Sequence, residues 1–248
     1  MKAKGGSAMK YEVWVGLEIH VELLTESKLF CGCSTAYGAE PNTRCCPVCL
    51  GLPGTLPVLN RKAIEYGIRT GIALDCQIAK RSKLDRKNYF YPDLPKAYQI
   101  SQYDQPLCEK GFLSLEDGKR IGIRRIHIEE DAGKLLHQED GTTWIDYNRA
   151  GVPLIEIVTE PDIRSSEEAA EFLENLKQIL QYIEVSDCRM EQGSLRCDIN
   201  VNVQSADASE RSEIVEIKNL NSFKAVAKAI EYEAKRHINL LKEGKNTL

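Results

Sequence analysis

Four cysteines are spaced as two close pairs within one short segment of the chain. They are Cys31, Cys33, Cys46 and Cys49. Two thiolate pairs supply the four ligands of a tetrahedral, protein-filled Zn²⁺ site, and such a site is structural and not catalytic. Cys45 is the alternative to Cys46, although only Cys46 has the two-residue spacing to Cys49. A group of reduced, buried thiols is the alternative to a metal. The spacing predicts a structural zinc site in a loop at about residues 30–57.

Acidic side chains recur at alternate positions of segments that have the pattern of β-strands. Apolar and polar residues alternate strictly over residues 11–23, so Glu18 and His20 share the polar face. If the predicted strands form one sheet, this face also carries Glu156, Asp198, Asn200 and either Glu129 or Glu130. Clustered carboxylates are costly without cations, and Mg²⁺ prefers oxygen ligands and often bridges to nucleotide phosphates. The pattern indicates a site for Mg²⁺ with a nucleotide, and its alternative is an ordinary solvated sheet face.

The orientation of Glu129 and Glu130 stays open at this point. Strict alternation groups Glu129 with Arg125 and His127, and it places Glu130 on the opposite face. A β-bulge near the adjacent arginines would reverse that assignment.

Residues 83–105 combine basic groups, five aromatic residues and two prolines. The positive residues in and beside this segment are Lys80, Arg81, Lys83, Arg86 and Lys87. Interleaved basic and aromatic side chains suit a nucleic-acid end, because they stack on bases and neutralise phosphates. The alternative is an ordered loop with a solvated basic rim. Lys87, Lys134 and Lys218 are candidates for neutralising a bound phosphate.

The composition is that of an ordinary globular protein. The 248 residues carry a formal charge of −4, with 42% hydrophobic and 28% charged residues, which excludes low-complexity disorder, collagen and coiled coil. No run approaches the ~18 apolar residues of a membrane span, and residues 1–10 lack the apolar stretch of a secretory signal. We therefore expect a flexible leader over residues 1–10, a cytoplasmic location and no membrane partner. The Walker A, Rossmann and HExxH motifs are absent from the sequence.

Helix and strand patterns together predict an α+β fold. Apolar stripes at helical spacing predict helices over residues 61–73, 165–183 and 223–241, with Ser165 and Glu168 as a capping pair. Strands are expected over residues 11–23, 121–129, 142–147, 153–159, 196–203 and 213–218. Because the connections are too short for repeated parallel crossovers, we expect a largely antiparallel sheet with helices on one face.

Six long segments resemble the B subunits of bacterial-type tRNA-dependent amidotransferases, the GatB family. They are GLEIHVEL (16–23), DRKNYFYPDLPKAYQISQYDQP (85–106), IHIEEDAGK (126–134), NRAGVPLIEIVTEPDIRS (148–165), GSLRCDINV (193–201) and EIKNLNSF (216–223). The likeness runs from about residue 11 to the end of the chain. The paired cysteines also resemble those of the zinc-bearing members of the family.

The resemblance implies that residues 11–248 form a catalytic, kinase-like cradle domain that is similar in fold to glutamine synthetase. It implies a ligase that works with GatA and GatC subunits as the GatCAB complex. Members of the GatB family use Mg-ATP to phosphorylate the side-chain carboxylate of Glu-tRNA(Gln) or Asp-tRNA(Asn), and ammonia from GatA then displaces the phosphate. The site residues carried over by resemblance are Glu18, His20, Glu130, Glu156 and, with them, Asp198, Asn200 and the phosphate-stabilising Lys87. Glu130 is chosen over Glu129 from its motif position, against strict alternation.

The family's chains continue past the position of Leu248, through the rest of the cradle, a helical domain and a tail domain. We therefore expect a C-terminally truncated chain in which the cradle is incomplete and the other two domains are absent. Alone it should bind tRNA weakly and lack catalysis. The alternatives are an archaeal-type GatE subunit, a non-catalytic zinc-stabilised RNA-binding module using residues 80–105, and an independent carboxylate-activating ligase for a small molecule.

Overall fold

The computed structural model describes residues 11–245 and 247, so the expected leader over residues 1–10 lies outside the described residues. The sheet strands are β1 (Tyr11–Glu22), β2 (Gln77–Ile78), β5 (Cys108–Ser114), β6 (Arg120–Glu130), β9 (Pro153–Thr159), β10 (Leu195–Ser205) and β11 (Val215–Leu220). Two separate hairpins are formed by β3 (Asp85–Asn88) with β4 (Tyr98–Ser101), and by β7 (Lys134–His137) with β8 (Thr143–Asp146). The helices are α1 (Arg61–Ala73), α2 (Ser166–Tyr182), α3 (Phe223–Lys242) and a short 3-10 turn over Met190–Gln192.

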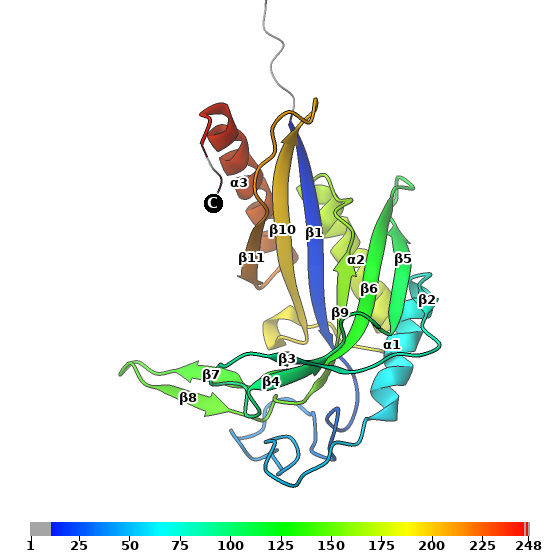
Figure 1. Ribbon diagram of the computed structural model, residues 1–248, viewed down its shortest axis with the longest axis vertical. Coiled ribbons are helices and arrows are strands. Elements are labelled where there is room, and N and C mark those ends of the chain that lie inside the picture. The colour runs from blue at the N-terminus through cyan, green and yellow to red at the C-terminus, as the bar shows by residue number, and fades with distance from the viewer. Residues whose placement is uncertain (1–10, 246, 248) are drawn as a thin grey trace, which may run out of the picture.

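The seven strands of the main sheet follow the order β11-β10-β1-β9-β6-β5-β2, and every neighbouring pair is antiparallel (Figure 1). Alternation along β1 determines its two faces. Val15, Leu17, Ile19 and Val21 are fully buried in the core, whereas the intervening Glu18 and His20 face the other side and are only partly covered. The predicted α+β fold with a largely antiparallel sheet is confirmed.

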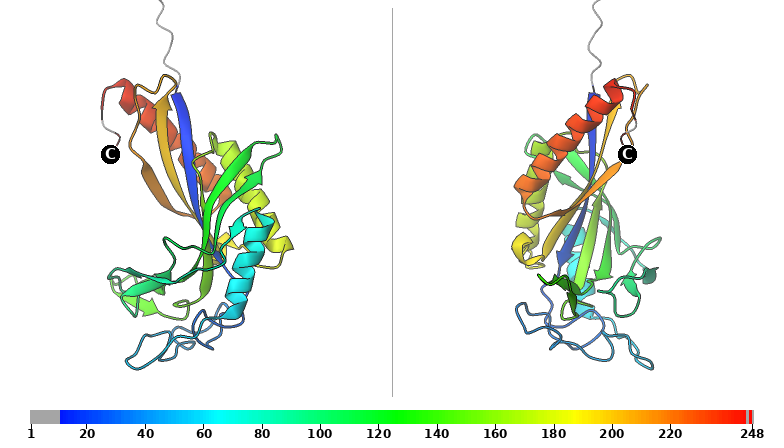
Figure 2. Two further views of the ribbon diagram at one scale, coloured as in Figure 1. Left: turned by 45° about the vertical axis from the view of Figure 1, so that its right-hand side comes forward. Right: turned by 90° about the vertical axis from the view of Figure 1, so that its left-hand side faces the viewer.

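The three helices cover the apolar face of the sheet. In Figure 2, α2 and α3 lie together on one side of the strands, and the β3–β4 hairpin lies on the other side. Helix α2 begins where predicted, because the Ser165 side chain accepts a hydrogen bond from the Glu168 amide. Helix α1 contains Gly67, and a Cβ at that position would lie 2.6 Å from Leu107 Cδ2 and 3.0 Å from Ile128 Cδ1. The glycine inside this helix therefore permits close contact with the sheet.

Five strands were not predicted, namely β2, β3, β4, β5 and β7. β3 (DRKN) and β4 (YQIS) form a hairpin of mostly polar residues. Because these two strands lack an alternation of apolar and polar residues, the pattern did not predict them. In β5, the apolar alternation is interrupted at Gly111. A side chain does not fit there, because Leu74 O lies 2.4 Å from the position that a Cβ would take.

β11 begins two residues after the predicted start at 213. Its pairing with β10 contains a register shift between Cys197 and Ile199.

The β3–β4 hairpin and the cysteine-containing loop lie at one end of the sheet, at the bottom of Figure 1. β4 contacts β6, which brings residues from the segment 83–105 onto the polar face of the sheet. Among residues 11–245 and 247, no helix is both long and apolar enough to cross a membrane.

Candidate functional site

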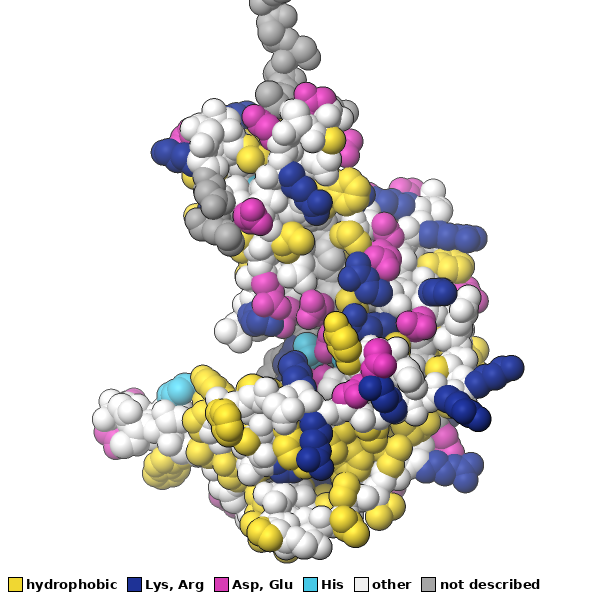
Figure 3. Space-filling view, viewed as in Figure 1, with side chains coloured by type: hydrophobic (Ala, Val, Ile, Leu, Met, Phe, Trp, Pro, Cys, Tyr) yellow, Lys and Arg dark blue, Asp and Glu magenta, His cyan; other side chains and the backbone are white. Residues whose placement is uncertain are grey.

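A cavity of about 470 Å³ opens on the polar face of the sheet, beside the β3–β4 hairpin. In Figure 3, acidic, basic and histidine side chains gather around a hollow midway down this face. Strand register brings the polar residues together, because His20 on β1 is opposite Glu156 on β9, and Glu156 is opposite His127 on β6. The predicted residues that line the cavity are Glu18, His20, Lys87, Glu156, Asp198 and Lys218.

The centre of this cavity is a group formed by His20, Glu129 and Glu156. One potential ligand atom from each residue lies within 4.8 Å of the other two, so the three can hold a single metal ion. His20 Nε2 is 3.6 Å from Glu156 Oε2. Both carboxylates are almost completely buried, at 2% and 7% exposure. Two buried carboxylates and an imidazole fit a divalent cation, and the oxygen-rich set is compatible with Mg²⁺.

Glu129 is held in this position by residues of β4. Gln99 Nε2 donates to Glu129 Oε1 at 3.0 Å, and Ser101 Oγ donates to Glu129 Oε2 at 2.7 Å. Because Gln99 and Ser101 are two residues apart on one strand, they present their side chains to the same face. The hairpin therefore orients one carboxylate of the candidate metal site.

Glu130 does not join this group, although its motif position predicted that it would. The pairing of β6 with β9 has a register shift between Ile123 and Arg125, but alternation holds from Arg125 onward, so Glu129 lies on the cavity side with Arg125 and His127. The Glu130 side chain lies on the opposite side of β6, where Glu130 Oε1 accepts a hydrogen bond from the Ile100 amide at 2.9 Å and also contacts the Lys96 ammonium. It lines a separate cavity next to the cysteine loop. Burial raises the pKa of the Glu130 carboxyl, and Lys96 opposes that shift only in part. The adjacent residue Glu129 takes the place in the cavity that was expected for Glu130.

The buried histidine of β6 gives the site its charge balance. His127 Nε2 lies 3.1 Å from Glu156 Oε2 and 3.6 Å from Glu129 Oε2. Burial opposes protonation of His127, but hydrogen bonds to the two carboxylates outweigh it and raise its pKa. Burial likewise opposes ionisation of Glu156, yet His127, His20 and Lys87 lower the pKa of its carboxyl to about 2. Glu156 is therefore an anion at neutral pH.

Two residues that line the cavity each have a buried polar atom with no hydrogen-bond partner among the described residues. The atoms are His127 Nδ1 and Arg125 Nε. An unpaired buried donor costs about 1–3 kcal/mol, so a tightly packed core would not ordinarily place such atoms here. The cavity therefore has the polar character of a binding site and not that of a filled core.

The remaining predicted acids lie beside the central group. Asn200 Nδ2 donates to Glu18 Oε1 at 3.1 Å, and Lys218 Nζ donates to Asp198 Oδ2 at 2.8 Å. Glu18 and Asp198 face each other across β1 and β10 and line the cavity, whereas Asn200 lines only the neighbouring cavity further along the sheet. The structure thus brings Asp198 closer to the expected site than Asn200.

The predicted cations have different positions. Lys87 on β3 lines the cavity, and its positive charge contributes to the low pKa of Glu156. Lys218 also lines the cavity, but it is paired with Asp198 and Glu216. Lys134 lies on the β7–β8 hairpin over the Tyr37 ring, 4.8 Å from its centroid, and does not line this cavity.

Several site residues were missed by the sequence analysis. His127, Gln99 and Ser101 all contact the central carboxylates. Strict alternation along 124–131 already grouped His127 with Glu129, so that signal was available. Nothing in the sequence of β4 shows that it lies against β6, because this contact joins elements that are not paired in the main sheet.

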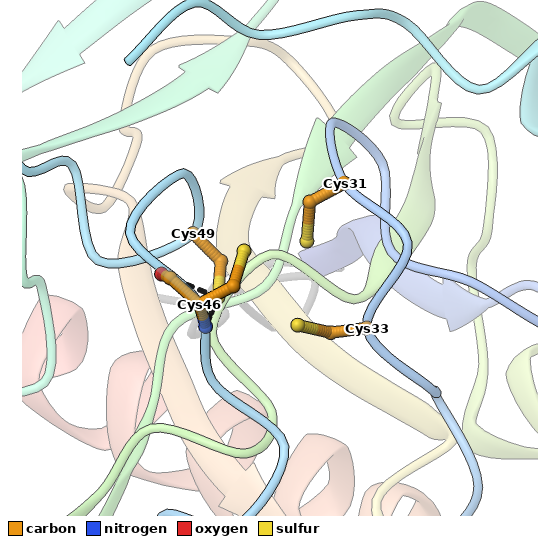
Figure 4. Close-up of side chains that lie close together, drawn as sticks. All are labelled: Cys31, Cys33, Cys46 and Cys49. Carbon is orange, nitrogen blue, oxygen red and sulfur yellow. Dashed lines mark hydrogen bonds between the residues drawn. The ribbon is translucent and has the colours of Figure 1, made fainter. Parts of the chain in front are cut away.

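The four paired cysteines form a second cluster, away from the sheet face. Their sulfur atoms all lie within 4.8 Å of one another, and Figure 4 shows them pointing to a common centre from two loop segments. Thiolates bound to tetrahedral Zn²⁺ at about 2.3 Å lie roughly 3.8 Å apart, so the cluster has the size of a Zn²⁺ site. Cys45 points elsewhere, with its Sγ 3.9 Å from Asn148 Oδ1. The arrangement favours Cys46 as the fourth ligand.

A buried lysine lies next to the cysteine cluster. Lys28 is 1% exposed, and its Nζ contacts Cys49 Sγ at 3.6 Å and the Tyr147 carbonyl at 3.2 Å. The Cys31 thiol donates a hydrogen bond to Cys49 and lowers its pKa, and burial acts in the opposite direction. With the further effects of the Cys46 amide and the Lys28 charge, the pKa of Cys49 falls to about 4. Cys49 is thus a thiolate at neutral pH, which is the form that binds a metal.

Comparison with known proteins identifies the family. The profile described as the GatB/GatE catalytic domain matches residues 13–248. A protein of Caldanaerobacter subterraneus, named as the B subunit of an aspartyl/glutamyl-tRNA(Asn/Gln) amidotransferase, is 66% identical over 239 residues, covering 95% of this chain and 50% of that protein. Proteins with the same name from Thermodesulfovibrio yellowstonii and Clostridium kluyveri are each 58% identical, over 97% and 95% of this chain and 51% and 50% of theirs. The chain spans about half the length of the curated relatives it matches, and it belongs to the GatB/GatE catalytic-domain family.

Proposed function

We propose that this chain is the catalytic region of a GatB-type amidotransferase protein, a ligase that uses Mg-ATP to activate the side-chain carboxylate of Glu-tRNA(Gln) or Asp-tRNA(Asn). The observation that carries this proposal is the group of His20, Glu129 and Glu156 in a polar cavity, with Lys87 beside it. The names of the relatives support an amidation of charged tRNA.

The reaction requires activation because a carboxylate oxygen is a poor leaving group. Attack of the side-chain carboxylate on the γ-phosphorus of ATP forms a new O–P bond, breaks the bond to the β-phosphate oxygen and releases ADP. Ammonia then attacks the acyl carbon and phosphate leaves, which gives the side-chain amide. The first step brings two anions together, so it depends on cationic groups that lower their repulsion.

The residues of the cavity divide this work. His20, Glu129 and Glu156 would hold Mg²⁺, with Glu18 and Asp198 beside them as further acidic groups. The bound ion would supply positive charge to the phosphate oxygens during phosphoryl transfer. Lys87 approaches from the hairpin side and would neutralise charge on the transferred phosphate. Glu129 replaces Glu130 in this assignment, because Glu130 faces away from the cavity.

The same proposal includes the partners and the second metal. GatA would supply ammonia from glutamine, GatC would complete the complex, and the misacylated tRNA would present its carboxylate to the cavity. Cys31, Cys33, Cys46 and Cys49 would hold a structural Zn²⁺ that fixes the loop beneath β4. The protein would act in the cytoplasm, where charged tRNA is used.

Calorimetric titration of ATP into the chain, with and without Mg²⁺, tests the nucleotide site. We expect Mg-dependent binding by the wild-type chain and its loss in Glu18→Gln and Glu156→Gln. Glu12→Gln is the matched control, because Glu12 is an exposed acid on the same face of β1. Binding in Glu156→Gln that equals wild type would remove the central group from the proposed site.

Amidation is measured in the assembled complex with misacylated tRNA. Glu18→Gln should abolish ATP-dependent amidation while glutamine hydrolysis by GatA remains. If the wild-type chain instead bound RNA with no effect of ATP or Mg²⁺, the non-catalytic module would replace this proposal.

A further inference from the structure

Lys28 is a fully buried lysine whose charge has no carboxylate partner. Its side chain is one of the largest that are completely enclosed, at 1% exposure. Among the residues that the structure describes, Lys28 forms no ion pair with an acid, and Glu130, which lines the same cavity beside the cysteine loop, pairs with Lys96 instead. A buried ammonium is stable only beside an anion or strong acceptors. The structure must therefore supply another counter-charge.

The group that faces the Lys28 ammonium is a cysteine sulfur. Nζ lies 3.6 Å from Cys49 Sγ and 3.2 Å from the Tyr147 carbonyl oxygen. The backbone of the same residue reaches the first cysteine pair, since the Lys28 amide donates to the Cys33 carbonyl oxygen at 3.0 Å. Lys28 thus contacts both cysteine-containing segments, one through its backbone and the other through its side chain.

The cysteine cluster requires positive charge when it holds a metal. Zn²⁺ bound by four thiolates leaves about two negative charges on the site. Cys49 is buried, and a buried anionic centre is costly unless cations or donors compensate it. The Cys46 amide donates to Cys49 Sγ at 3.1 Å, but it carries no charge. Within the described part of the chain, Lys28 is the cationic side chain that lies within hydrogen-bond distance of a cluster sulfur.

We propose that Lys28 is the built-in counter-ion of the four-cysteine metal site and that its ammonium sets the affinity of this site for Zn²⁺. Metal binding displaces thiol protons, so charge compensation by Lys28 matters most in the loaded form. Groups outside the ligand set commonly change metal affinity by about 10–100-fold. The inference rests on the zinc part of the proposed function, and it assigns a residue that the cysteine spacing does not reveal.

Lys28→Met is the central test, because it removes the charge and keeps an unbranched side chain of similar length. Competition with a chelator for Zn²⁺ should show at least about a tenfold loss of affinity in this variant. Lys96→Met is the matched control, because Lys96 is a second largely buried lysine beside the loop, and its partner is the Glu130 carboxylate. The control should change zinc affinity by less than about twofold.

Stability separates a counter-ion from a lysine that only fills space. In the zinc-loaded chain, Lys28→Met should lower the melting temperature, by about 3–6 °C for a tenfold loss of affinity. In a Cys49→Ser background the anionic sulfur is absent, so the same substitution should leave the melting temperature unchanged or raise it. A lysine with a packing role alone would give the same shift in both backgrounds.

Co²⁺ in place of Zn²⁺ reports on the sulfur atoms directly. Thiolate-bound Co²⁺ has a sulfur-to-metal charge-transfer band, and a hydrogen bond to the sulfur moves this band to higher energy. Lys28→Met should therefore shift the band to lower energy, whereas Lys96→Met should leave it in place.

Each contrary outcome has a distinct meaning. Unchanged zinc affinity in Lys28→Met would overturn the counter-ion and leave the zinc site standing. Equal falls in melting temperature in the wild-type and Cys49→Ser backgrounds would also overturn it, as would failure of Lys28→Met to fold with and without Zn²⁺, because Lys28 would then be structural. If the wild-type chain bound no Zn²⁺ after anaerobic purification and reconstitution, the zinc part of the proposed function and this inference would fall together.

Discussion

The carboxylates of Glu129 and Glu130 are adjacent in sequence but lie on opposite sides of β6. Glu129 faces the candidate metal site and accepts hydrogen bonds from Gln99 and Ser101 on β4. Glu130 faces the other way and accepts a hydrogen bond from the backbone amide of Ile100, which lies between Gln99 and Ser101 on β4. Together the two acids hold β4 against β6 from both sides. Only one of them is available to a ligand in the cavity.

This relationship predicts different effects for the two glutamine substitutions. Glu129→Gln removes a charge from the candidate metal site, so Mg-dependent ATP binding should fall by at least about tenfold. Glu130→Gln should keep nucleotide binding within about twofold but lower the free energy of unfolding by about 1–3 kcal/mol, because Lys96 loses its buried counter-charge. Calorimetry and urea denaturation of both variants measure the two effects. Loss of ATP binding in Glu130→Gln alone would reverse the assignment.

Lys87 is predicted to act on phosphate through its charge. Lys87→Met keeps the length of the side chain but removes the ammonium group, so Mg-ATP binding should weaken by about tenfold. Lys80→Met is the matched control, because Lys80 is an exposed lysine that precedes the hairpin and does not line the cavity. Titration calorimetry at low and moderate salt measures both variants. An equal decrease in the two variants would indicate general electrostatic attraction instead of a specific contact.

The zinc assignment predicts a difference between two adjacent cysteines. Cys46→Ser removes a sulfur from the four-atom cluster, so zinc content should fall well below one ion per chain. The melting temperature should fall by on the order of 5 °C, because the loop loses its cross-link. Cys45→Ser should retain both zinc and stability, since Cys45 points to Asn148. Metal analysis after anaerobic purification decides between them, and zinc loss in Cys45→Ser alone would exchange their roles.

Much of the fold and part of the site could be predicted from local sequence patterns. Long periodic segments such as α2 and β1 have one apolar face that must be buried, so their existence and orientation follow from spacing alone. The same rule placed Glu18, His20 and Glu156 on one face. Alternation also grouped Glu129 with Arg125 and His127 but left open which face they occupy, and the motif-based choice of Glu130 selected the acid that lies outside the cavity.

The rest depends on contacts that leave no periodic signal. The β3–β4 hairpin is short and polar, and its place against β6 arises from hydrogen bonds such as Gln99 to Glu129. The neighbouring cavity that Gly16, Glu18 and Asn200 line depends on Gly16 lying opposite Asn200, and this pairing joins strands that are far apart in sequence. Such pairings are determined by tertiary packing, so spacing within one segment does not reveal them.

A buried histidine in α3 predicts how stability depends on pH. His237 is 0% exposed, with Ser212 Oγ 2.8 Å from Nδ1 and Glu233 Oε1 3.0 Å from Nε2. A neutral imidazole that accepts from Ser212 and donates to Glu233 satisfies both ring nitrogens. The Arg236 guanidinium, whose Nη2 lies 3.2 Å from Nε2, disfavours a further positive charge on the ring. Burial lowers the pKa of His237, despite the opposing effect of Glu233.

A lowered histidine pKa means that the unfolded chain takes up a proton before the folded chain does. Stability from this residue is therefore present above the unfolded pKa of about 6.5 and is lost as pH falls, by at most about 1.4 kcal/mol per pH unit. Urea denaturation between pH 7 and pH 5 should show a shallower decline for His237→Gln than for wild type. His137→Gln, which changes an exposed histidine on β7, should decline as wild type does. Parallel curves for wild type and His237→Gln would show that His237 does not remain neutral in the folded chain.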